Sequence, residues 1–436
     1  MKNLAQSFVY AFKGITYCLA HERNMRIHLC FTLFMFGFLT VHDFFEVTKT
    51  QFALLFAVCS SVLALECVNT AIEKSVDLST KEINPVAAIA KDTAAIQSAI
   101  DAASAAGGGT VVIPPGTYLS GTVFLKSDVK IEFEKGAVLK ASPDKGDYCG
   151  PDAFAQNYAC DYDNTSGGHL IVAADCTNIA ITGPGRIDGN SAAFLTDDKG
   201  RQYDNWKKGI PWRPGQMLYI VDCRNVVIEG MEMVNSPYWT CLLFNCEKVT
   251  VQDCVIRTER KKYRTWNGDG IDIDRCRDVF VTRCDIDTED DAITLRASMG
   301  GKVRFAQECR NVKVERCRLS SNCNAIRVGV GEGVIRDCHL SQIDVHNTAT
   351  AVNIISSYTP SSRGTDIRDV TFASVQGECD RFLSLGYGRK KGDALDAVIE
   401  NITFQDVRVK VRKENDIREE SSRPFGNIIF DDGATR

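Results

Sequence analysis

A unit resembling x-Cys-x-Asn-Val-x-Val-x-x-Cys recurs in this chain and restricts its possible folds more than any other feature. Copies lie near Cys223, Cys246, Cys276 and Cys309, at intervals of 23, 30 and 33 residues. Short β-branched runs separated by Asn and Gly turns accompany them, and internal repeats of this period indicate a solenoid. Because the leucine pattern of a leucine-rich repeat is absent, we predict a mainly β protein with a right-handed parallel β-helix.

Each coil of such a solenoid buries its apolar face only against neighbouring coils, so the first coil needs a cover. An amphipathic helix at about residues 93–105, followed by GGGT, is expected to form this cap. The chain has 18 cysteines, and many recur eight residues apart. We interpret them as small apolar side chains stacked inside the repeat, because no arrangement typical of a zinc site occurs. Reduced thiols suit a cytosolic location.

The composition is that of a soluble globular protein on average, with 44% apolar and 25% charged residues in 436. It excludes a disordered chain, a collagen and a multi-span transporter. The net charge is −5, whereas proteins that bind nucleic acid usually carry an excess of positive charge, so no nucleic-acid partner is expected. Almost all long apolar runs precede residue 91, whereas Gly, Asn, Asp, Val and Ile dominate after residue 93. We therefore expect two domains, residues 1–92 and 93–436.

Two apolar segments near the N-terminus, Ile27–Val47 and Phe52–Ile72, are each about long enough to cross a bilayer. Polar residues interrupt both, so buried core helices remain an alternative to about two transmembrane helices. The basic N-terminus predicts that this end of the chain is cytoplasmic. No cleavage site typical of a secretory signal peptide follows it.

The second segment carries polar residues at helical spacing. Glu66, Asn69, Glu73 and Asp77 are three, four and four residues apart, so a helix places them on one face. Carboxylates arranged in this way suit a divalent metal ion together with a phosphate. A solvated helix end is the alternative.

Several motifs give this region a resemblance to the bacterial diacylglycerol kinase and undecaprenol kinase family. They are SFVYAFKGI (7–15), ERNMRIHL (22–29), ALECVNTAIEKSVDL (64–78) and AKD (90–92). The resemblance implies phosphorylation of a membrane lipid alcohol with ATP and Mg²⁺. Such kinases continue with a third membrane helix, whereas this chain continues with TAAIQSAIDAASAAGGGT. The kinase-like part therefore looks truncated.

The kinase resemblance also implies roles for individual residues. Glu66 would be the base toward the lipid hydroxyl, and Glu22 and Glu73 would be Mg²⁺ ligands. The residues implied to lie beside the metal or to contact ATP are Asn69, Asp77, Tyr10, Lys91 and Asp92.

Two acidic clusters mark the β-helical region. Asp269 in NGDGIDID precedes Asp290 and Asp291 in TEDDAI by 21 and 22 residues, about one coil. Because stacked coils are about 4.8 Å apart, the three carboxylates should meet on one face. Repulsion between them would raise one pKa and create a proton donor beside ionised partners, which glycoside hydrolysis requires. Aspartates in structural turns and a calcium site, as in β-helical lyases, are the alternatives.

This region resembles glycoside hydrolase family 28, the polygalacturonases and rhamnogalacturonan hydrolases, which have a pectin-lyase-like β-helix. The matching stretches are 107–127, GPGRIDG (183–189), 213–230, NSPYWT (235–240), NGDGIDID (267–274) and EDDAI (289–293). The resemblance implies inverting hydrolysis of a pectic polysaccharide or oligosaccharide without a cofactor. Asp290 would be the general acid, and Asp269 and Asp291 would activate water. Acid and base in such enzymes are about 6.5–9.5 Å apart.

The sequence departs from this family in two places. Asn322-Cys323-Asn324 stands where Gly-His-Gly is expected, and Asn353-Ile354-Ile355 stands where the family has the Arg-Ile-Lys that grips a uronate carboxylate. We hypothesise that Arg327 partly replaces the missing cation, since Arg binds carboxylates in a bidentate manner. An outward, solvated Arg327 is the alternative. Asn267, Asn324 and Arg327 are the candidate substrate-binding residues.

The two resemblances meet at Lys91-Asp92-Thr93-Ala94-Ala95, a sequence similar to one in both families. A join at this shared sequence, natural or artificial, and a membrane-tethered hydrolase with a reused anchor both fit. With two crossings, the β-helix would face the cytoplasm. Three function classes stand: a glycoside hydrolase, a lipid kinase and a non-catalytic carbohydrate-binding β-helix. The expected partners are a polysaccharide or oligosaccharide, membrane lipid and, through the membrane segment, further copies of the chain.

Overall fold

The computed structural model divides into two units, Met1–Lys91 and Asp92–Arg436. The residues that the structure describes are 16, 19, 22–41, 48–79, 85–157, 166–194, 212–258, 267–298, 308–357, 364–388, 397–419 and 424–431.

The first unit contains the helices α2 (Arg23–Val41) and α3 (Lys49–Ser79). Apolar side chains such as Phe31 lie exposed on them. Within α3, the stretch Lys49–Val68 is long and apolar enough to cross a membrane, whereas the apolar stretch Asn24–Leu39 is shorter. Among the described residues one candidate span is therefore present, and the expected number of two is not confirmed.

Helix α4 (Pro85–Ala105) provides the cover that the first coil of the second unit needs. From α4, Ile96 and Ile100 are buried in the same apolar core as the strands. The side-chain amide of Gln97 exchanges two hydrogen bonds with the backbone of Phe124, at 2.8 and 3.0 Å. The amphipathic pattern at residues 93–105 thus correctly predicts an N-terminal cap.

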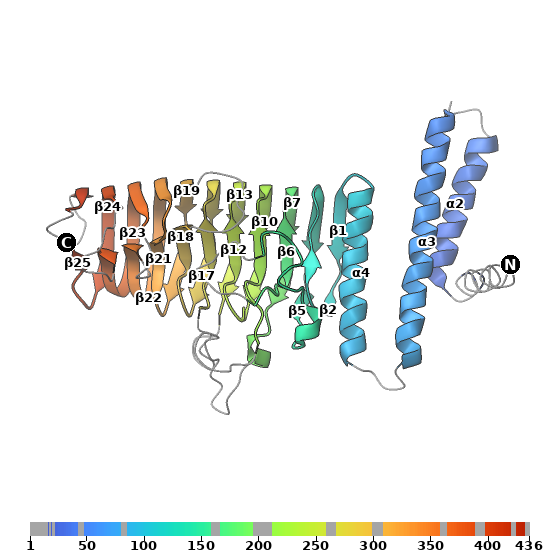
Figure 1. Ribbon diagram of the computed structural model, residues 1–436, viewed down its shortest axis with the longest axis horizontal. Helices are drawn as coiled ribbons and strands as arrows, with labels where there is room; N and C mark the ends of the chain where they lie inside the picture. Colours follow the sequence, from blue (N-terminus) through green and yellow to red (C-terminus); the bar gives the residue numbers. More distant parts are fainter. Residues whose placement is uncertain are drawn as a thin grey trace. The chain divides into compact units, whose positions relative to one another are not determined.

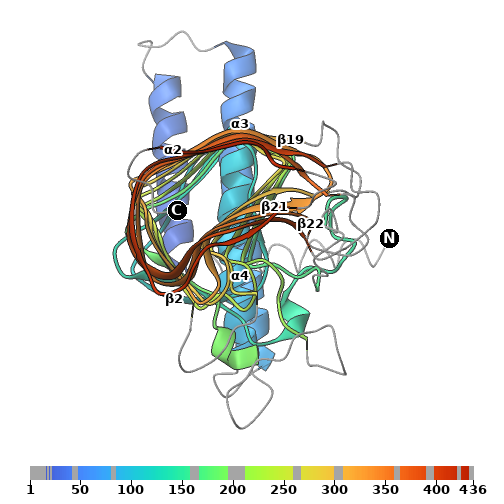
Figure 2. The same ribbon diagram turned by 90° about the vertical axis from the view of Figure 1, so that its left-hand side faces the viewer.

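The second unit is a parallel β-helix whose strands stack rung on rung in three columns, as Figures 1 and 2 show. The first column contains β1 (Gly109–Ile113), β4 (Val129–Phe133), β7 (Thr177–Thr182), β10 (Arg224–Glu229), β13 (Glu247–Gln252), β16 (Arg277–Thr282), β19 (Glu308–Glu315) and β26 (Gly426–Phe430). The second contains β2 (Gly116–Ser120), β5 (Ala137–Ala141), β8 (Arg186–Asp188), β11 (Glu232–Val234), β14 (Val255–Arg257), β17 (Asp285–Thr288) and β20 (Arg318–Ser321). The third contains β3 (Val123–Phe124), β6 (Ile171–Ala174), β9 (Leu218–Val221), β12 (Cys241–Phe244), β15 (Ile271–Asp274), β18 (Ile293–Ala297), β21 (Asn324–Gly331) and β25 (Asp416–Arg418).

Three long bent strands continue the columns toward the C-terminus: β22 (Val334–Ser357), β23 (Asp366–Gly388) and β24 (Ile399–Val411). Two short 3₁₀ helices, η1 (Lys145–Asp147) and η2 (Ser191–Phe194), lie between strands. The mainly β fold with a parallel β-helix is thus confirmed.

The alternation of residues along each strand explains the stacking. Val226, Val249, Val279 and Val312 occupy the same register position in four successive rungs, and each is at most 2% exposed. Because side chains alternate between the two faces of a strand, every second residue enters the core. This column of β-branched side chains is the structural counterpart of the sequence repeat.

Cysteines form a column of their own at the start of these strands. Cys223, Cys246, Cys276 and Cys309 are buried and free. The backbone N–H of Cys246 lies 3.3 Å from the sulfur of Cys276 on the next rung. The interpretation of these residues as stacked small apolar side chains is therefore correct.

Candidate active site

Successive rungs of the third column bring the acidic clusters together. Asp269 lies just before β15, whereas Asp290 and Asp291 lie between β17 and β18. Strands β15 and β18 pair in parallel, and the backbone N–H of Gly270 donates to the carbonyl of Asp291 at 2.9 Å. All three aspartates line one small pocket. The spacing of 21 and 22 residues therefore does correspond to adjacent coils.

The environment of this acidic trio raises the pKa of two members. Burial, followed by the charges of Asp291 and Glu289, raises the pKa of Asp290 to about 7. Burial also raises the pKa of Asp269 well above its usual range, and the neighbouring aspartates act in the same direction. Asp290 and Asp269 therefore keep their protons to a higher pH than ordinary carboxyls do. A protonated carboxyl beside further carboxylates is the arrangement that general acid catalysis needs.

Two donors hold the carboxylate of Asp291. The Asn324 side-chain amide donates to its Oδ1, and Nη1 of Arg327 lies 3.2 Å from its Oδ2. Both donors come from β21, the rung after β18. Arg327 is 8% exposed and lines the pocket. It is therefore not the outward, solvated side chain of the alternative interpretation.

The spacing of two carboxyls differs from the expectation. Asp290, Asp291 and the Cys323 sulfur offer atoms that all lie within 4.8 Å of one another. This separation is shorter than the 6.5–9.5 Å that usually leaves room for a water between acid and base. Two aspartates adjacent in the chain share one turn, which explains their proximity. Asp269 lies on a different rung, 21 residues before Asp290, so the constraint of a shared turn does not apply to this pair.

Sequence reasoning missed two arginines at this site. Arg296 is 4% exposed, and its guanidinium lies 4.4 Å from the ring centre of Trp239. It also lies 3.4 Å from a carboxylate oxygen of Asp274, its register partner in β15. Arg213 donates to Oδ1 of Asn267 at 3.1 Å. The one available signal was the charge of Arg296 within the otherwise uncharged strand β18.

The two departures from the family pattern lie side by side. Asn324 begins β21, and Asn353 lies in β22, the next rung. The side-chain amide of Asn353 donates to Oδ1 of Asn324 at 3.0 Å. Cys323 therefore stands where the resemblance implies a histidine, next to Asn324, and the neutral amide of Asn353 stands where it implies an arginine.

The kinase-like residues are only partly described. Tyr10 lies outside the described residues, as do the side chains of Asn69, Glu73, Asp77 and Lys91. Glu22 and Glu66 are half-buried, and α3 continues as one helix from Glu66 to beyond Asp77. The carboxylate of Asp92 accepts a hydrogen bond from the Leu119 backbone at 3.0 Å, within the β-helical unit. The roles implied for these residues stay predictions.

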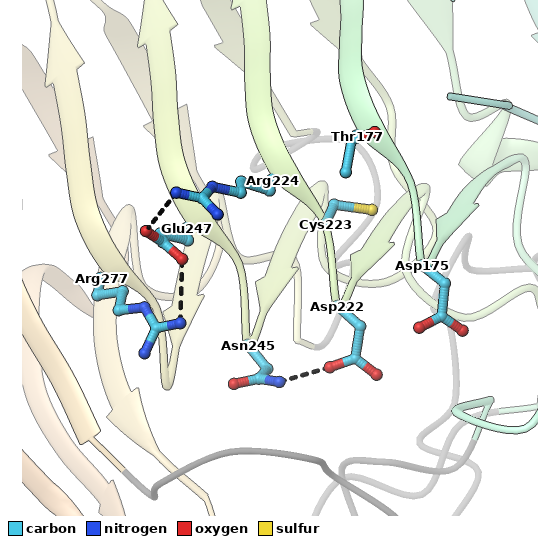
Figure 3. A pocket seen from close by; sticks show the side chains of 8 residues that line it. All are labelled: Asp175, Thr177, Asp222, Cys223, Arg224, Asn245, Glu247 and Arg277. Atoms are coloured by element: carbon cyan, nitrogen blue, oxygen red, sulfur yellow. Dashed lines mark hydrogen bonds and ion pairs between the residues drawn. The ribbon is translucent and has the colours of Figure 1, made fainter. Parts of the chain in front are cut away.

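A larger pocket, of about 380 Å³, lies along the ends of neighbouring rungs and does not include the acidic trio (Figure 3). Its charged groups face one another across the rungs. Arg224 and Arg277 both pair with Glu247, and Asn245 donates to Asp222 (Figure 3). These pairs link successive coils, and we interpret the pocket as structural despite its size.

Comparison with known proteins shows similarity to two families, each over a different part of the chain. The family model for prokaryotic diacylglycerol kinase matches residues 9–113, and that for glycosyl hydrolases family 28 matches residues 106–309. An endo-polygalacturonase from Pectobacterium parmentieri is 23% identical over 331 residues, covering 68% of this chain and 81% of that protein. A diacylglycerol kinase from Synechocystis sp. is 36% identical over 115 residues, and the match spans 26% of this chain and 64% of that kinase.

The solved structure of a polygalacturonase from Erwinia carotovora ssp. carotovora has the same fold. It superposes with a TM-score of 0.57 at 21% identity, covering 77% of this chain and 93% of that one. The second unit thus belongs to the class of parallel β-helical proteins. More particularly, residues 106–309 are similar to glycosyl hydrolases family 28, among them polygalacturonases, and residues 9–113 are similar to prokaryotic diacylglycerol kinases. The kinase match continues past residue 92, into α4 and β1.

Proposed function

We propose that the β-helix hydrolyses glycosidic bonds of a pectic polysaccharide or oligosaccharide with inversion at the anomeric carbon. The observation that carries this proposal is the acidic trio, in which burial and neighbouring charges raise the pKa of Asp290 to about 7. A carboxyl that is still protonated in mildly acidic solution can donate its proton to a leaving group. The match to the family 28 hydrolases supports the same chemistry.

In this mechanism Asp290 donates its proton to the glycosidic oxygen as the bond to the anomeric carbon breaks. A water molecule attacks that carbon from the opposite face and gives its proton to Asp269 or Asp291. Asp291 is the carboxylate that Asn324 and Arg327 hold in place, whereas Asp269 can accept a proton only in its ionised form, which its raised pKa disfavours. The charge of Asp291 would then stabilise the positive charge that develops on the sugar ring.

The substrate class rests on the relatives, since the endo-polygalacturonase from Pectobacterium parmentieri is named for its action on polygalacturonan. Asn267, Asn324 and Arg327 would border the sugar units on either side of the broken bond. Since the Arg327 guanidinium is already paired with Asp291, we expect weaker uronate recognition here than a free cation would give. The hydrolase needs no cofactor for this chemistry.

The test is release of reducing ends from homogalacturonan, rhamnogalacturonan and neutral pectic oligosaccharides at mildly acidic pH, with the full chain in detergent. Asp290→Asn should lower the rate of reducing-end release at least a hundredfold, because the variant cannot donate a proton at this position. Asp253→Asn is the matched control, since Asp253 is an exposed aspartate paired with Arg283. A folded wild-type chain that releases nothing from any glycan would leave a carbohydrate-binding β-helix as the better proposal.

A second candidate function is ATP-dependent phosphorylation of a membrane lipid alcohol, supported by the kinase family match. The spacing of Glu66, Asn69, Glu73 and Asp77 supports this function, because steps of three and four residues share one face of a helix and such oxygen ligands suit Mg²⁺. Glu22 and Glu73 would hold the ion, which would neutralise phosphate charge, and Glu66 would accept the lipid hydroxyl proton. Transfer of labelled phosphate to diacylglycerol or undecaprenol, lost in Glu66→Gln, would support this function. If the wild-type chain transfers no phosphate to either lipid, this second candidate function is rejected.

We further propose that the chain is membrane-associated with the β-helix on the cytoplasmic side. The apolar stretch Lys49–Val68 and the kinase match support membrane association. The basic N-terminus supports the cytoplasmic side if α2 and α3 both cross. Self-association through these helices is the corresponding oligomer proposal, and crosslinking in detergent tests it.

A further inference from the structure

A row of side chains spanning three rungs ends at Asp291. Asn353 in β22 donates its amide to Oδ1 of Asn324 at 3.0 Å. Asn324, at the start of β21, donates its own amide to Oδ1 of Asp291, beside β18. The amide of Asn324 is therefore held between the other two side chains.

The direction of these hydrogen bonds follows from the chemistry of the groups. An ionised carboxylate only accepts hydrogen bonds, so Asn324 must turn its NH₂ group toward Asp291. The carbonyl oxygen of Asn324 then faces Asn353, which must answer with its own NH₂ group. The two amides thus form a one-way relay of donors toward Asp291.

This relay has an energetic cost at its outer end. The Oδ1 atom of Asn353 is buried and has no hydrogen-bond partner within the described part of the chain. A buried acceptor without a donor is unfavourable, and most such groups in folded proteins are paired. The orientation of the Asn353 amide is therefore not explained by the stability of this rung. It is explained if its purpose is to hold the carboxylate of Asp291 in place.

We propose that Asn353 is a positioning residue that acts through Asn324 to fix the carboxylate of Asp291. The inference rests on the proposed hydrolysis, in which Asp291 stabilises the charge that develops on the sugar. Asn353 itself does not touch the substrate. If Asn353 lacks its NH₂ group, the side-chain amide of Asn324 is free to rotate. The carboxylate of Asp291 is then held by the Arg327 hydrogen bond and no longer by Asn324.

The kinetic test compares Asn353→Ala and Asn353→Asp in the full chain. Asn353→Ala should lower kcat about tenfold or more with KM within about twofold, because misplacing a catalytic group affects the rate and not substrate binding. Asn353→Asp should lower kcat at least as far although it is nearly isosteric. A carboxylate at this position can only accept, so it would turn the NH₂ group of Asn324 away from Asp291.

The matched control is Asn401→Asp, the same chemical change at an exposed position of β24, where Asn401 donates to Asp369. It should leave kcat and KM unchanged. A rise in KM with an unchanged kcat for Asn353→Ala would overturn the inference in favour of direct sugar binding. A milder effect of Asn353→Asp than of Asn353→Ala would overturn it in favour of packing.

A second measurement decides the inference without activity. Denaturation midpoints of Asn353→Ala, Asp291→Ala and the double variant should be non-additive, and the coupling should vanish in an Asn324→Ala background. Additive midpoint shifts would overturn the relay. If the wild-type chain hydrolyses no glycan, the proposed function fails, and this cycle still determines whether the relay exists.

Discussion

Replacing the proposed acid with a neutral amide should remove activity and make the β-helix more stable at high pH. Burial raises the pKa of Asp290 to about 7 from an ordinary value of 3.8, which means that the folded state binds this proton more tightly than the unfolded state. The stability contributed by this group is fully present below about pH 3.8 and is lost as the pH rises through about 7. Three pKa units correspond to about 4 kcal/mol, and we expect Asp290→Asn to recover about 2–4 kcal/mol at pH 8. At pH 4 the two proteins should be nearly equal.

Urea unfolding followed by tryptophan fluorescence is the suitable assay. All four tryptophans lie in the second unit, so the signal reports the β-helix and not the N-terminal helices. Asp253→Asn is the control with the opposite sign, because Arg283 lowers the pKa of Asp253. The reasoning would be refuted if Asp290→Asn raised the free energy of unfolding equally at pH 4 and pH 8, or did not raise it at pH 8.

Three further predictions concern the rate, the pocket wall and the cap. The hydrolysis rate should fall as the pH rises through about 7, as Asp290 loses its proton; an unchanged rate at pH 9 would exclude Asp290 as the acid. Arg296→Met should destabilise the β-helix by about 3–5 kcal/mol in urea unfolding, because it leaves the buried Asp272 and Asp274 without this cation. Ile100→Ala should cost about 2–5 kcal/mol, since Ile100 is fully buried between α4 and the first coils; a loss below about 1 kcal/mol would contradict the capping role.

The coil-to-coil spacing was predictable, whereas the contacts within the site were not. The distance of one coil between Asp269 and the Asp290–Asp291 pair follows from the repeat, so their meeting could be predicted from the sequence. The pairing of Arg327 with Asp291 and the amide contact between Asn353 and Asn324 depend on rotamers of side chains on different rungs. No local pattern encodes such contacts. Arg296 was missed because stacking on Trp239 compensates the burial of its charge, and that partner is 57 residues away in sequence.

The most direct test of the central claim is the anomeric configuration of the first product, recorded by proton NMR during hydrolysis of a pectic oligosaccharide. We predict that the newly formed reducing end first appears with the configuration opposite to that of the substrate and then mutarotates, because water attacks while Asp290 protonates the leaving oxygen. The close approach of Asp290 and Asp291, within 4.8 Å, makes this measurement decisive, since a carboxylate nucleophile is the competing chemistry. A first product with retained configuration would contradict the assignment of the trio as acid, base and charge stabiliser.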